Sequence, residues 1–254
     1  IISANSCNHG GASICLGNGQ SEKYVGAGFI GSGSCNFVTG LNSCAYNGLG
    51  INGPASGIIQ DSSCNDSTGD NVCYGNGSAN STSNEGSTGQ GKIESNSCNN
   101  ALGSSVCKSN GEAYDRNAYG VIKSNSCNNA GERACSNNGM GLIYEGYGLI
   151  GSFSCNSGFS STCESNGEGG NATIGDNSCN TMSNTAKSCY ANGRNNAQFS
   201  VAATIGKYAC NAPNACNENQ GQISDNCCNF PGACNKNIGD IIAGTVECDG
   251  PSSS

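Results

Sequence analysis

The stretch Ile122-Lys123-Ser124-Asn125-Ser126-Cys127-Asn128, continued by Ala134-Cys135-Ser136-Asn137-Asn138-Gly139, is one copy of the unit from which this chain is built. As a pattern the unit reads Ile, four residues, Cys-Asn, a short variable turn, then Cys, two residues and Asn, with Gly next or close after. The pattern recurs nine times along the 254 residues. Five columns that recur at fixed offsets indicate a solenoid, in which each copy forms one coil and stacks on the next.

Three of the five columns are not cysteine. The isoleucines are Ile2, Ile30, Ile59, Ile93, Ile122, Ile150, Ile174, Ile205 and Ile223. The asparagines directly after the first cysteine are Asn8, Asn36, Asn65, Asn99, Asn128, Asn156, Asn180, Asn211 and Asn229. The asparagines three residues after the second cysteine are Asn18, Asn47, Asn76, Asn110, Asn138, Asn166, Asn192, Asn219 and Asn237.

The shortest copy limits what one coil can contain. It runs from Cys210 to Cys228, which is 18 residues and too short for a helix and a strand with their turns. Two or three short strands fit, with side chains alternating in and out. The sequence therefore predicts an all-β parallel β-helix of about ten coils spaced about 4.8 Å apart, with right-handed crossovers as the expectation. It forms one domain over residues 1–249, and residues 250–254 are a Ser-rich tail.

Each column then has an expected role. The isoleucines form an internal aliphatic stack. The asparagines form ladders in which each amide bonds its neighbours above and below and satisfies turn backbone. The Asn-Gly pairs of the second column predict left-handed backbone. Glycine two residues before the isoleucine, as at Gly57 and Gly120, predicts another corner of the coil.

Composition favours a secreted protein with little apolar core. The chain has 40 Gly, 20 Cys, no Trp and 11% charged residues. An even number of cysteines at this density is typical of an oxidising compartment, so we expect an extracellular or cell-surface protein. The chain begins at Ile1 rather than Met, which favours a mature chain that has lost its signal peptide. No apolar run is long enough to span a membrane, and 10 scattered basic residues against 18 acidic ones make a nucleic-acid partner a poor fit.

The cysteines predict one disulfide per coil, since both occur together in every copy, including the shortest. A bridge between neighbouring coils, which are about 4.8 Å apart, stays the alternative. A metal site is disfavoured because no C-x-x-C spacing occurs and His9 is the single histidine, and no cofactor is expected. Cys227 and Cys248 are left to clamp a partial tenth coil. The expected pairs are Cys7–Cys15, Cys35–Cys44, Cys64–Cys73, Cys98–Cys107, Cys127–Cys135, Cys155–Cys163, Cys179–Cys189, Cys210–Cys216, Cys228–Cys234 and Cys227–Cys248.

Four Asn-x-Ser/Thr sequons are present, at Asn65, Asn76, Asn80 and Asn171. The first two lie in the ladder columns, where a glycan would force the side chain outward. Asn80 and Asn171 are the expected N-glycosylation sites, in segments interpreted as loops.

Carbohydrate-cleaving enzymes also use β-helices, so the acidic residues are candidates for a catalytic site. Asp61, Asp176 and Asp225 share one column, three residues before the first cysteine, with Lys207 between the last two. Catalysis would need two or three carboxylates converging on one face. A solvated surface cluster is the simpler interpretation, and we expect no enzyme activity.

Two binding functions compete with a structural one. Ice binding favours a flat face of aligned threonines, and the outward column here has none: it is Asn5, Gly33, Ser62, Asn96, Asn125, Phe153, Asn177, Tyr208 and Asn226. A flat Ser/Asn face keeps ice binding as an alternative. Tyrosines in predicted loops keep recognition of a glycan or a protein as another, namely Tyr24, Tyr114, Tyr119, Tyr144 and Tyr147.

The repeat also resembles a known group of sequences. The repeated unit is Ile-Gly-x-x-Ser-Cys-Asn … Ala-Cys, and the stretch from Ile205 to Asn211, with Ala215-Cys216 after it, shows it most compactly. Over Ile1 to Cys248 the chain is similar to the cysteine-rich β-helix repeats of extracellular proteins of algae and other protists. That resemblance implies the β-helix architecture and a place in surface coats or flagellar hair fibres, and it carries over no catalytic residue.

The function expected from the sequence is therefore structural. A first coil beginning at Ile1-Ile2 with no capping element would leave an edge open to stacking. A head-to-tail contact that does not close becomes a filament. We expect an extracellular, non-catalytic subunit of a filament or cell-surface assembly, whose partners are copies of itself, other surface proteins or glycans.

Overall fold

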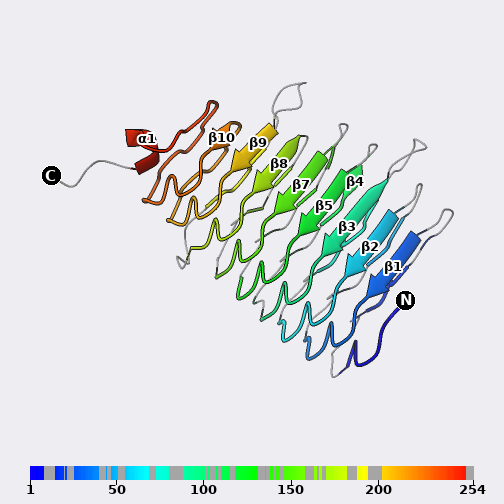
Figure 1. The fold of residues 1–254 in the computed structure, drawn as a ribbon. Coiled ribbons are helices and arrows are strands. Elements are labelled where there is room, and N and C mark those ends of the chain that lie inside the picture. The colour runs from blue at the N-terminus through cyan, green and yellow to red at the C-terminus, as the bar shows by residue number, and fades with distance from the viewer. Residues whose placement is uncertain are drawn as a thin grey trace.

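The structure of the chain is a computed structural model, and it describes every residue except 9–14, 20, 22–25, 40–43, 45–46, 51–54, 69–72, 80–87, 101, 103–106, 108–109, 115–117, 131–134, 136–137, 140, 143–145, 158–162, 165, 168–169, 182–187, 194–201 and 250–254. The coils stack along one axis, and the two chain ends lie at opposite ends of the stack (Figure 1). The predicted parallel β-helix is confirmed. The predicted tail, residues 250–254, lies outside the described residues.

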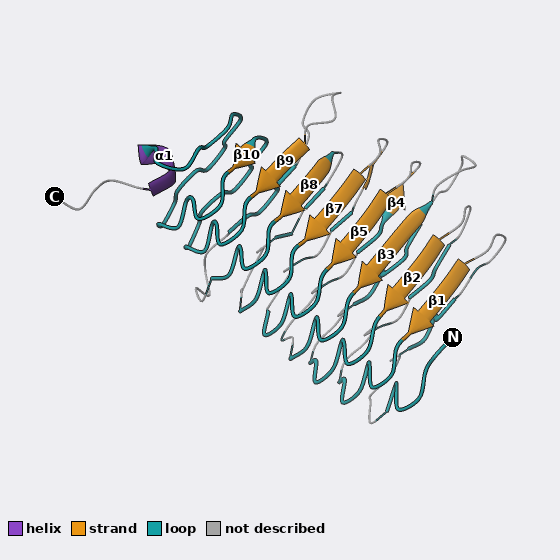
Figure 2. Cartoon of the chain, in the orientation of Figure 1, coloured by secondary structure: helices purple, strands orange, loops and turns teal. Residues whose placement is uncertain are grey.

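One parallel sheet forms a wall of the solenoid, and its strands are the orange arrows of Figure 2. Its strands in spatial order are β1 (Gly26–Ile30), β2 (Ala55–Ile59), β3 (Gly89–Ile93), β5 (Ala118–Ile122), β7 (Gly146–Ile150), β8 (Asn171–Ile174), β9 (Ala202–Ile205) and β10 (Gln222–Ile223). A second, two-stranded sheet pairs β4 (Ala113–Tyr114) with β6 (Gly141–Leu142). A short helix, α1 (Val246–Asp249), follows the last coil and was not predicted.

The register of the large sheet aligns the repeats without a slip. Ile30 pairs with Ile59, Ile59 with Ile93, and the same alignment continues to Ile223. Single bridges extend the column to Ile2 at one end and Ile241 at the other. A slip of one residue would turn every isoleucine to the solvent face, so burial of this column fixes the register.

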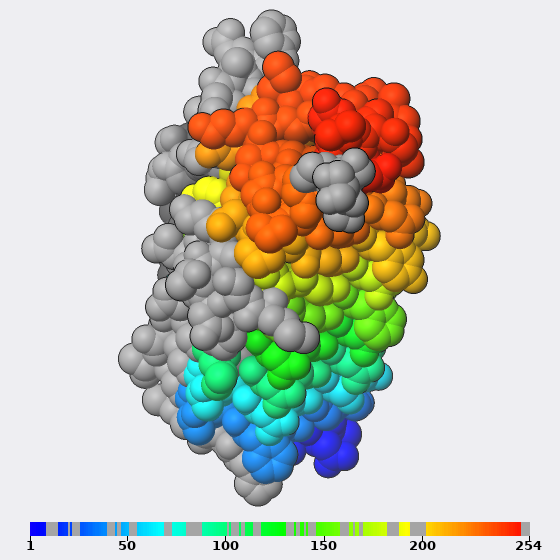
Figure 3. Space-filling view, turned by 90° about the vertical axis from the view of Figure 1, so that its left-hand side faces the viewer, coloured from blue at the N-terminus to red at the C-terminus, as the bar shows by residue number. Residues whose placement is uncertain are grey.

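The core is narrow and consists of the isoleucine column and the cysteines. The side chains of Ile30, Ile59, Ile93, Ile122, Ile150, Ile174 and Ile205 are fully buried. Burying one such side chain contributes about 1.5–3 kcal/mol. In Figure 3 the coils follow one another as successive bands of colour along the rod.

The glycine column does not mark a corner, as the sequence had suggested, but lies inside the strands. Gly57, Gly91 and Gly120 are the central residues of β2, β3 and β5. A Cβ on any of them would collide with the carbonyl group of a second-column asparagine, for example that of Asn110 at Gly120. Two backbone walls meet here with no room for a side chain, which explains the glycine.

Left-handed backbone also occurs at other positions than those predicted. Gly48, Gly77, Gly111 and Gly139 follow the second-column asparagines, but they are glycine because a Cβ would meet the neighbouring strand backbone. The predicted left-handed backbone occurs at Gly19, Gly167 and Gly193, with φ of 93°, 83° and 74°. The first cysteine of every coil is also left-handed, which was not predicted, with φ between 57° and 62°. Such a conformation costs a non-glycine residue about 1–2 kcal/mol, and at each of these cysteines the backbone N–H bonds a carbonyl of the next coil.

Candidate structural site: the disulfide column and the hydrogen-bonded columns

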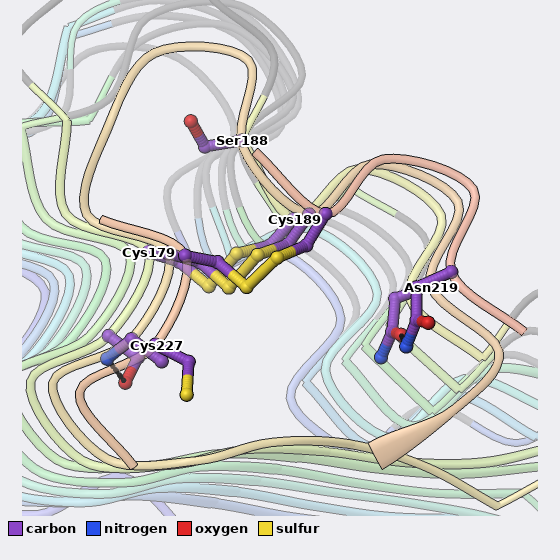
Figure 4. Close-up of a disulfide and its surroundings, with 12 residues drawn as sticks. Cys179, Ser188, Cys189, Asn219 and Cys227 are labelled. Atoms are coloured by element: carbon purple, nitrogen blue, oxygen red, sulfur yellow. Dashed lines mark hydrogen bonds between the residues drawn. A yellow bond between two sulfur atoms is a disulfide. The ribbon is translucent and has the colours of Figure 1, made fainter. Parts of the chain in front are cut away.

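Ten disulfides hold the coils, and they are the ten pairs expected from the sequence. Nine join two cysteines of one coil across Cα–Cα distances of 5.9 to 6.6 Å, so the bridges run within coils rather than between them. No cysteine is free. Figure 4 shows the bridges stacked in a row across the interior beside Cys179–Cys189.

The sulfur atoms of neighbouring coils come close enough to resemble a metal site. Those of Cys35, Cys44 and Cys64 lie within 4.8 Å of one another. Metal ions bind cysteine as the thiolate, and each of these sulfurs is already bonded to another sulfur. The grouping therefore follows from the stacking of disulfides.

The tenth disulfide, Cys227–Cys248, closes the last coil. Cys227 stands where earlier coils have serine, and the Cys228 N–H donates to the Cys248 carbonyl at 2.8 Å. In the first six coils that hydrogen bond goes to the serine carbonyl of the next coil. The disulfide and helix α1 thus supply the carbonyl that a complete tenth repeat would have supplied.

A buried serine column, which the sequence analysis missed, ties each coil to the next. Each hydroxyl donates to a carbonyl of the next coil at 2.6 to 3.0 Å and accepts that coil's N–H at 3.1 to 3.4 Å. The signal was a serine directly before the first cysteine in seven of the nine copies. The members are Ser6, Ser34, Ser63, Ser97, Ser126, Ser154 and Ser178.

The first asparagine column differs from the predicted amide-to-amide ladder. The backbone N–H of each asparagine donates to the Oδ1 of the next, as from Asn99 to Asn128 at 2.8 Å. The Nδ2 then donates backwards to a main-chain carbonyl, as from Asn128 to Asn96 at 2.9 Å. Eight bonds of each kind run along the column, so each asparagine side chain links its own coil to the backbone of the preceding coil.

The second asparagine column is the predicted ladder, and its direction reverses once. From Asn18 to Asn166 each Nδ2 donates to the Oδ1 of the following coil at 2.6 to 2.8 Å. Asn237 and Asn219 instead donate to the preceding coil, both at 2.9 Å. Asn219 and Asn237 also bond the backbone two residues ahead, which fixes the orientation of their amides. At the reversal, the Nδ2 of fully buried Asn166 has no hydrogen-bond partner among the residues that the structure describes.

The sequons lie in different surroundings. Asn65 donates its Nδ2 to the Gly33 carbonyl at 2.8 Å, and Asn76 is fully buried in the ladder. Asn171 is exposed, but it is the first residue of β8 rather than part of a loop. Asn80 lies outside the described residues.

Of the charged column, the structure pairs Lys207 with Asp176, and the carboxylates of the column bond the backbone. The Lys207 Nζ lies 3.7 Å from Asp176. Asp61, Asp176 and Asp225 each accept, on Oδ1, the backbone N–H of the same column position in the preceding coil, at 2.6 to 2.8 Å. This column is thus a further tie between coils, and half of each carboxylate is already occupied.

The predicted recognition residues are scattered. Tyr119 and Tyr147 lie in β5 and β7 and point outward from the sheet, so they are not loop residues as expected. Tyr114 lies in β4, and Tyr24 and Tyr144 are outside the described residues. In the column weighed for ice binding, Phe153 and Tyr208 are each about half exposed. A shallow apolar hollow lies over β1 and β2, with Phe29 and Ile58 in its lining.

Comparison with known proteins found no matching family model, no similar curated protein and no similar solved structure. Among the described residues, no helix has the length and apolar character needed to cross a bilayer. The fold and the columns define the class of protein, a disulfide-closed parallel β-helix.

Proposed function

We propose that this chain is an extracellular structural protein, a non-catalytic subunit of a filament or cell-surface assembly. The observation that carries the proposal is the connection of each coil to the next. Every coil is closed by its own disulfide, and serine, asparagine and aspartate side chains fasten it to its neighbours. Such connections resist bending, proteolysis and separation of the coils, as a load-carrying rod requires.

The two ends of the rod favour end-to-end contact between copies. Exposed apolar side chains gather at both, with 46 to 83% of their surface accessible: Ile1, Ile2 and Leu16 at one end, Ile238, Ile242 and Val246 at the other. Apolar contact between ends is not screened by salt, so assembly should survive high ionic strength. An oxidising compartment fits a chain whose twenty cysteines are all paired.

Electron microscopy of the natively purified, unreduced protein tests the proposal. We expect fibres with an axial repeat of roughly 45–50 Å, the length of about ten coils at about 4.8 Å each. The double variant Ile242→Asp/Val246→Asp should shorten or abolish them, because it places charges on one end. The control Phe153→Asp changes an exposed residue on the side of the rod and should leave the fibres intact.

Dispersed single rods at every protein and salt concentration would contradict the proposal. Thermal hysteresis and glycan-binding measurements on those rods would then test the two alternatives, ice binding and sugar recognition. If only the Phe153→Asp variant lost the fibres, the contact between copies would lie on the side of the rod rather than at its ends.

A further inference from the structure

The outer face of the large sheet holds a sequon at its surface. In β8 the side chains of Ala172 and Ile174 are turned to the interior, and Asn171 and Thr173 face outward. Asn171-Ala172-Thr173 is an acceptor sequence for N-linked glycosylation. Both residues that define the acceptor therefore stand on the same solvent-facing surface.

The amide of Asn171 is available in a way that the ladder amides are not. Its side chain forms no hydrogen bond within the described part of the chain. By contrast, Asn76 donates to Asn110 and accepts from Asn47 while fully buried, and Asn65 donates to the Gly33 carbonyl. A glycan on Asn65 or Asn76 would remove these bonds, whereas a glycan on Asn171 breaks none.

The residues beside Asn171 form a surface on which a sugar can pack. In the sheet register Asn171 lies beside Tyr147 on one strand and Ala202 on the other. Tyr147, followed by Tyr119 on the next strand, leaves 39% of its surface exposed. An exposed aromatic ring offers an apolar face, and the small Ala202 leaves room above the sheet.

We propose that Asn171 carries an N-linked glycan whose first N-acetylglucosamine lies against the ring of Tyr147. The donor is a lipid-pyrophosphate-linked oligosaccharide of the secretory pathway. The Asn171 Nδ2 forms a bond to the anomeric carbon, the lipid pyrophosphate leaves, and the amide nitrogen loses one proton. The glycan stands on the side of the rod, away from both ends, so it is independent of end-to-end assembly.

The site is tested by secretion from a eukaryotic host whose own secreted proteins carry N-linked glycans. The protein is made in an Asn80→Gln background, purified from the medium without reduction, and deglycosylated by an amidase in H₂¹⁸O before peptide mapping. We expect the Asn171 peptide to carry the ¹⁸O-labelled aspartate, and the Asn65 and Asn76 peptides to be unlabelled. An unmodified Asn171 in the secreted protein would overturn the proposal.

Variants of the third sequon position separate loss of the acceptor from loss of folding. Thr173→Ser keeps the acceptor and should keep the glycan. Thr173→Ala and Asn171→Gln should each reduce the mass by one glycan, with the ten disulfides unchanged by mapping. Equal occupancy in Thr173→Ala and the parent protein would contradict a glycan at this sequon.

The contact between the glycan and Tyr147 is tested separately, by thermal unfolding. Tyr147→Ala should leave occupancy unchanged, since the acceptor sequence is intact. Enzymatic removal of the glycan should then lower the Tm of the parent protein by more than that of the Tyr147→Ala variant. An equal fall in Tm in both would reject the contact with Tyr147 and leave the modification site standing.

Discussion

Asparagine does two different things in this solenoid, although both columns look alike in the sequence. In the first column the Oδ1 and Nδ2 of one side chain bond the backbones of other coils. In the second column the amides bond one another in the buried end of the coil. An amide has one donor end and one acceptor end, so a ladder of amides has a direction. The two directions meet between Asn166 and Asn192, and within the described part of the chain the buried Nδ2 of Asn166 has no partner.

Replacing ladder asparagines by aspartate tests this reversal. Asn110 uses its Nδ2 to donate to Asn138, so Asn110→Asp loses a buried hydrogen bond and turns an oxygen towards another oxygen. Asn166→Asp loses no hydrogen bond, and its Oδ1 still accepts from Asn138. Both variants bury a carboxyl group of the same shape. We expect Asn110→Asp to cost about 1–3 kcal/mol more than Asn166→Asp.

The comparison needs the free energy of unfolding of both variants, from denaturant titration with the disulfides intact. Equal losses would mean that the ladder has no reversal at Asn166. A larger loss at Asn166 would mean that its Nδ2 has a partner that the aspartate cannot replace.

Among the elements, the strands of the large sheet depend on glycine at their centres as well as on their buried isoleucines. Their C-terminal ends hold the buried isoleucines, while the centres of β2, β3, β5 and β7 are glycine and lie against the carbonyl groups of the asparagine turns. Glycine in a strand interior costs conformational entropy, on the order of 0.5–1 kcal/mol. The close approach of two backbone walls makes it necessary here.

A methyl group at the centre of a strand should therefore be far more damaging than its size suggests. Gly120→Ala places a Cβ against the Asn110 carbonyl, so β5 or the turn must shift. We expect a loss of at least about 1–3 kcal/mol from overpacking. Gly239→Ala is the control, because a Cβ there meets nothing within 4 Å. Thermal unfolding followed by circular dichroism compares the two, and equal Tm values would contradict the close approach.

In the whole molecule, disulfides and hydrogen-bonded columns replace the wide hydrophobic core of a globular domain. Each coil bridge closes a loop of 6 to 10 residues in sequence separation. Bridges across loops of this length contribute about 2–3 kcal/mol each in the chain-entropy account. The bridges of the inner coils are fully buried, whereas Cys7, Cys15 and Cys234 at the ends are only partly so.

Reduction under native conditions should then proceed from the ends. A reductant must reach the sulfur atoms, and burial blocks that access in the middle of the rod. We expect mild reduction with alkylation to label Cys7–Cys15 and Cys228–Cys234 before Cys127–Cys135. Mass mapping over time measures the order. If Cys127–Cys135 were labelled as fast as the end pairs, the rod would open in its middle rather than at its ends.

The sequence was a good guide to architecture and a poorer one to the role of particular columns. The parallel β-helix follows from the repeat, because stacked coils place equal positions beside one another. The disulfide pairs were expected because both cysteines occur in every copy, and the structure decided for them over bridges between coils. The serine column was overlooked, since serine is common in loops of this composition. The charged column was a candidate site because it contains acidic and basic residues. Its hydrogen bonds to the backbone depend on the distance between coils, which the spacing of residues along the chain does not give.

The sequence by itself determined the repeat and the register, because a period and a fixed offset are properties of the chain, and it favoured one disulfide per coil without excluding a bridge between coils. Only the tertiary structure decided that the first cysteine of each coil is left-handed, why Gly120 lies within a strand, and which way each amide points. These features arise from contacts between two walls of the coil. The number of residues that separates the contacting positions along the chain changes from coil to coil. The orientation of an amide at Asn166 or Asn192 depends on the turns of its own coil and of both neighbours, and no single copy of the repeat contains them.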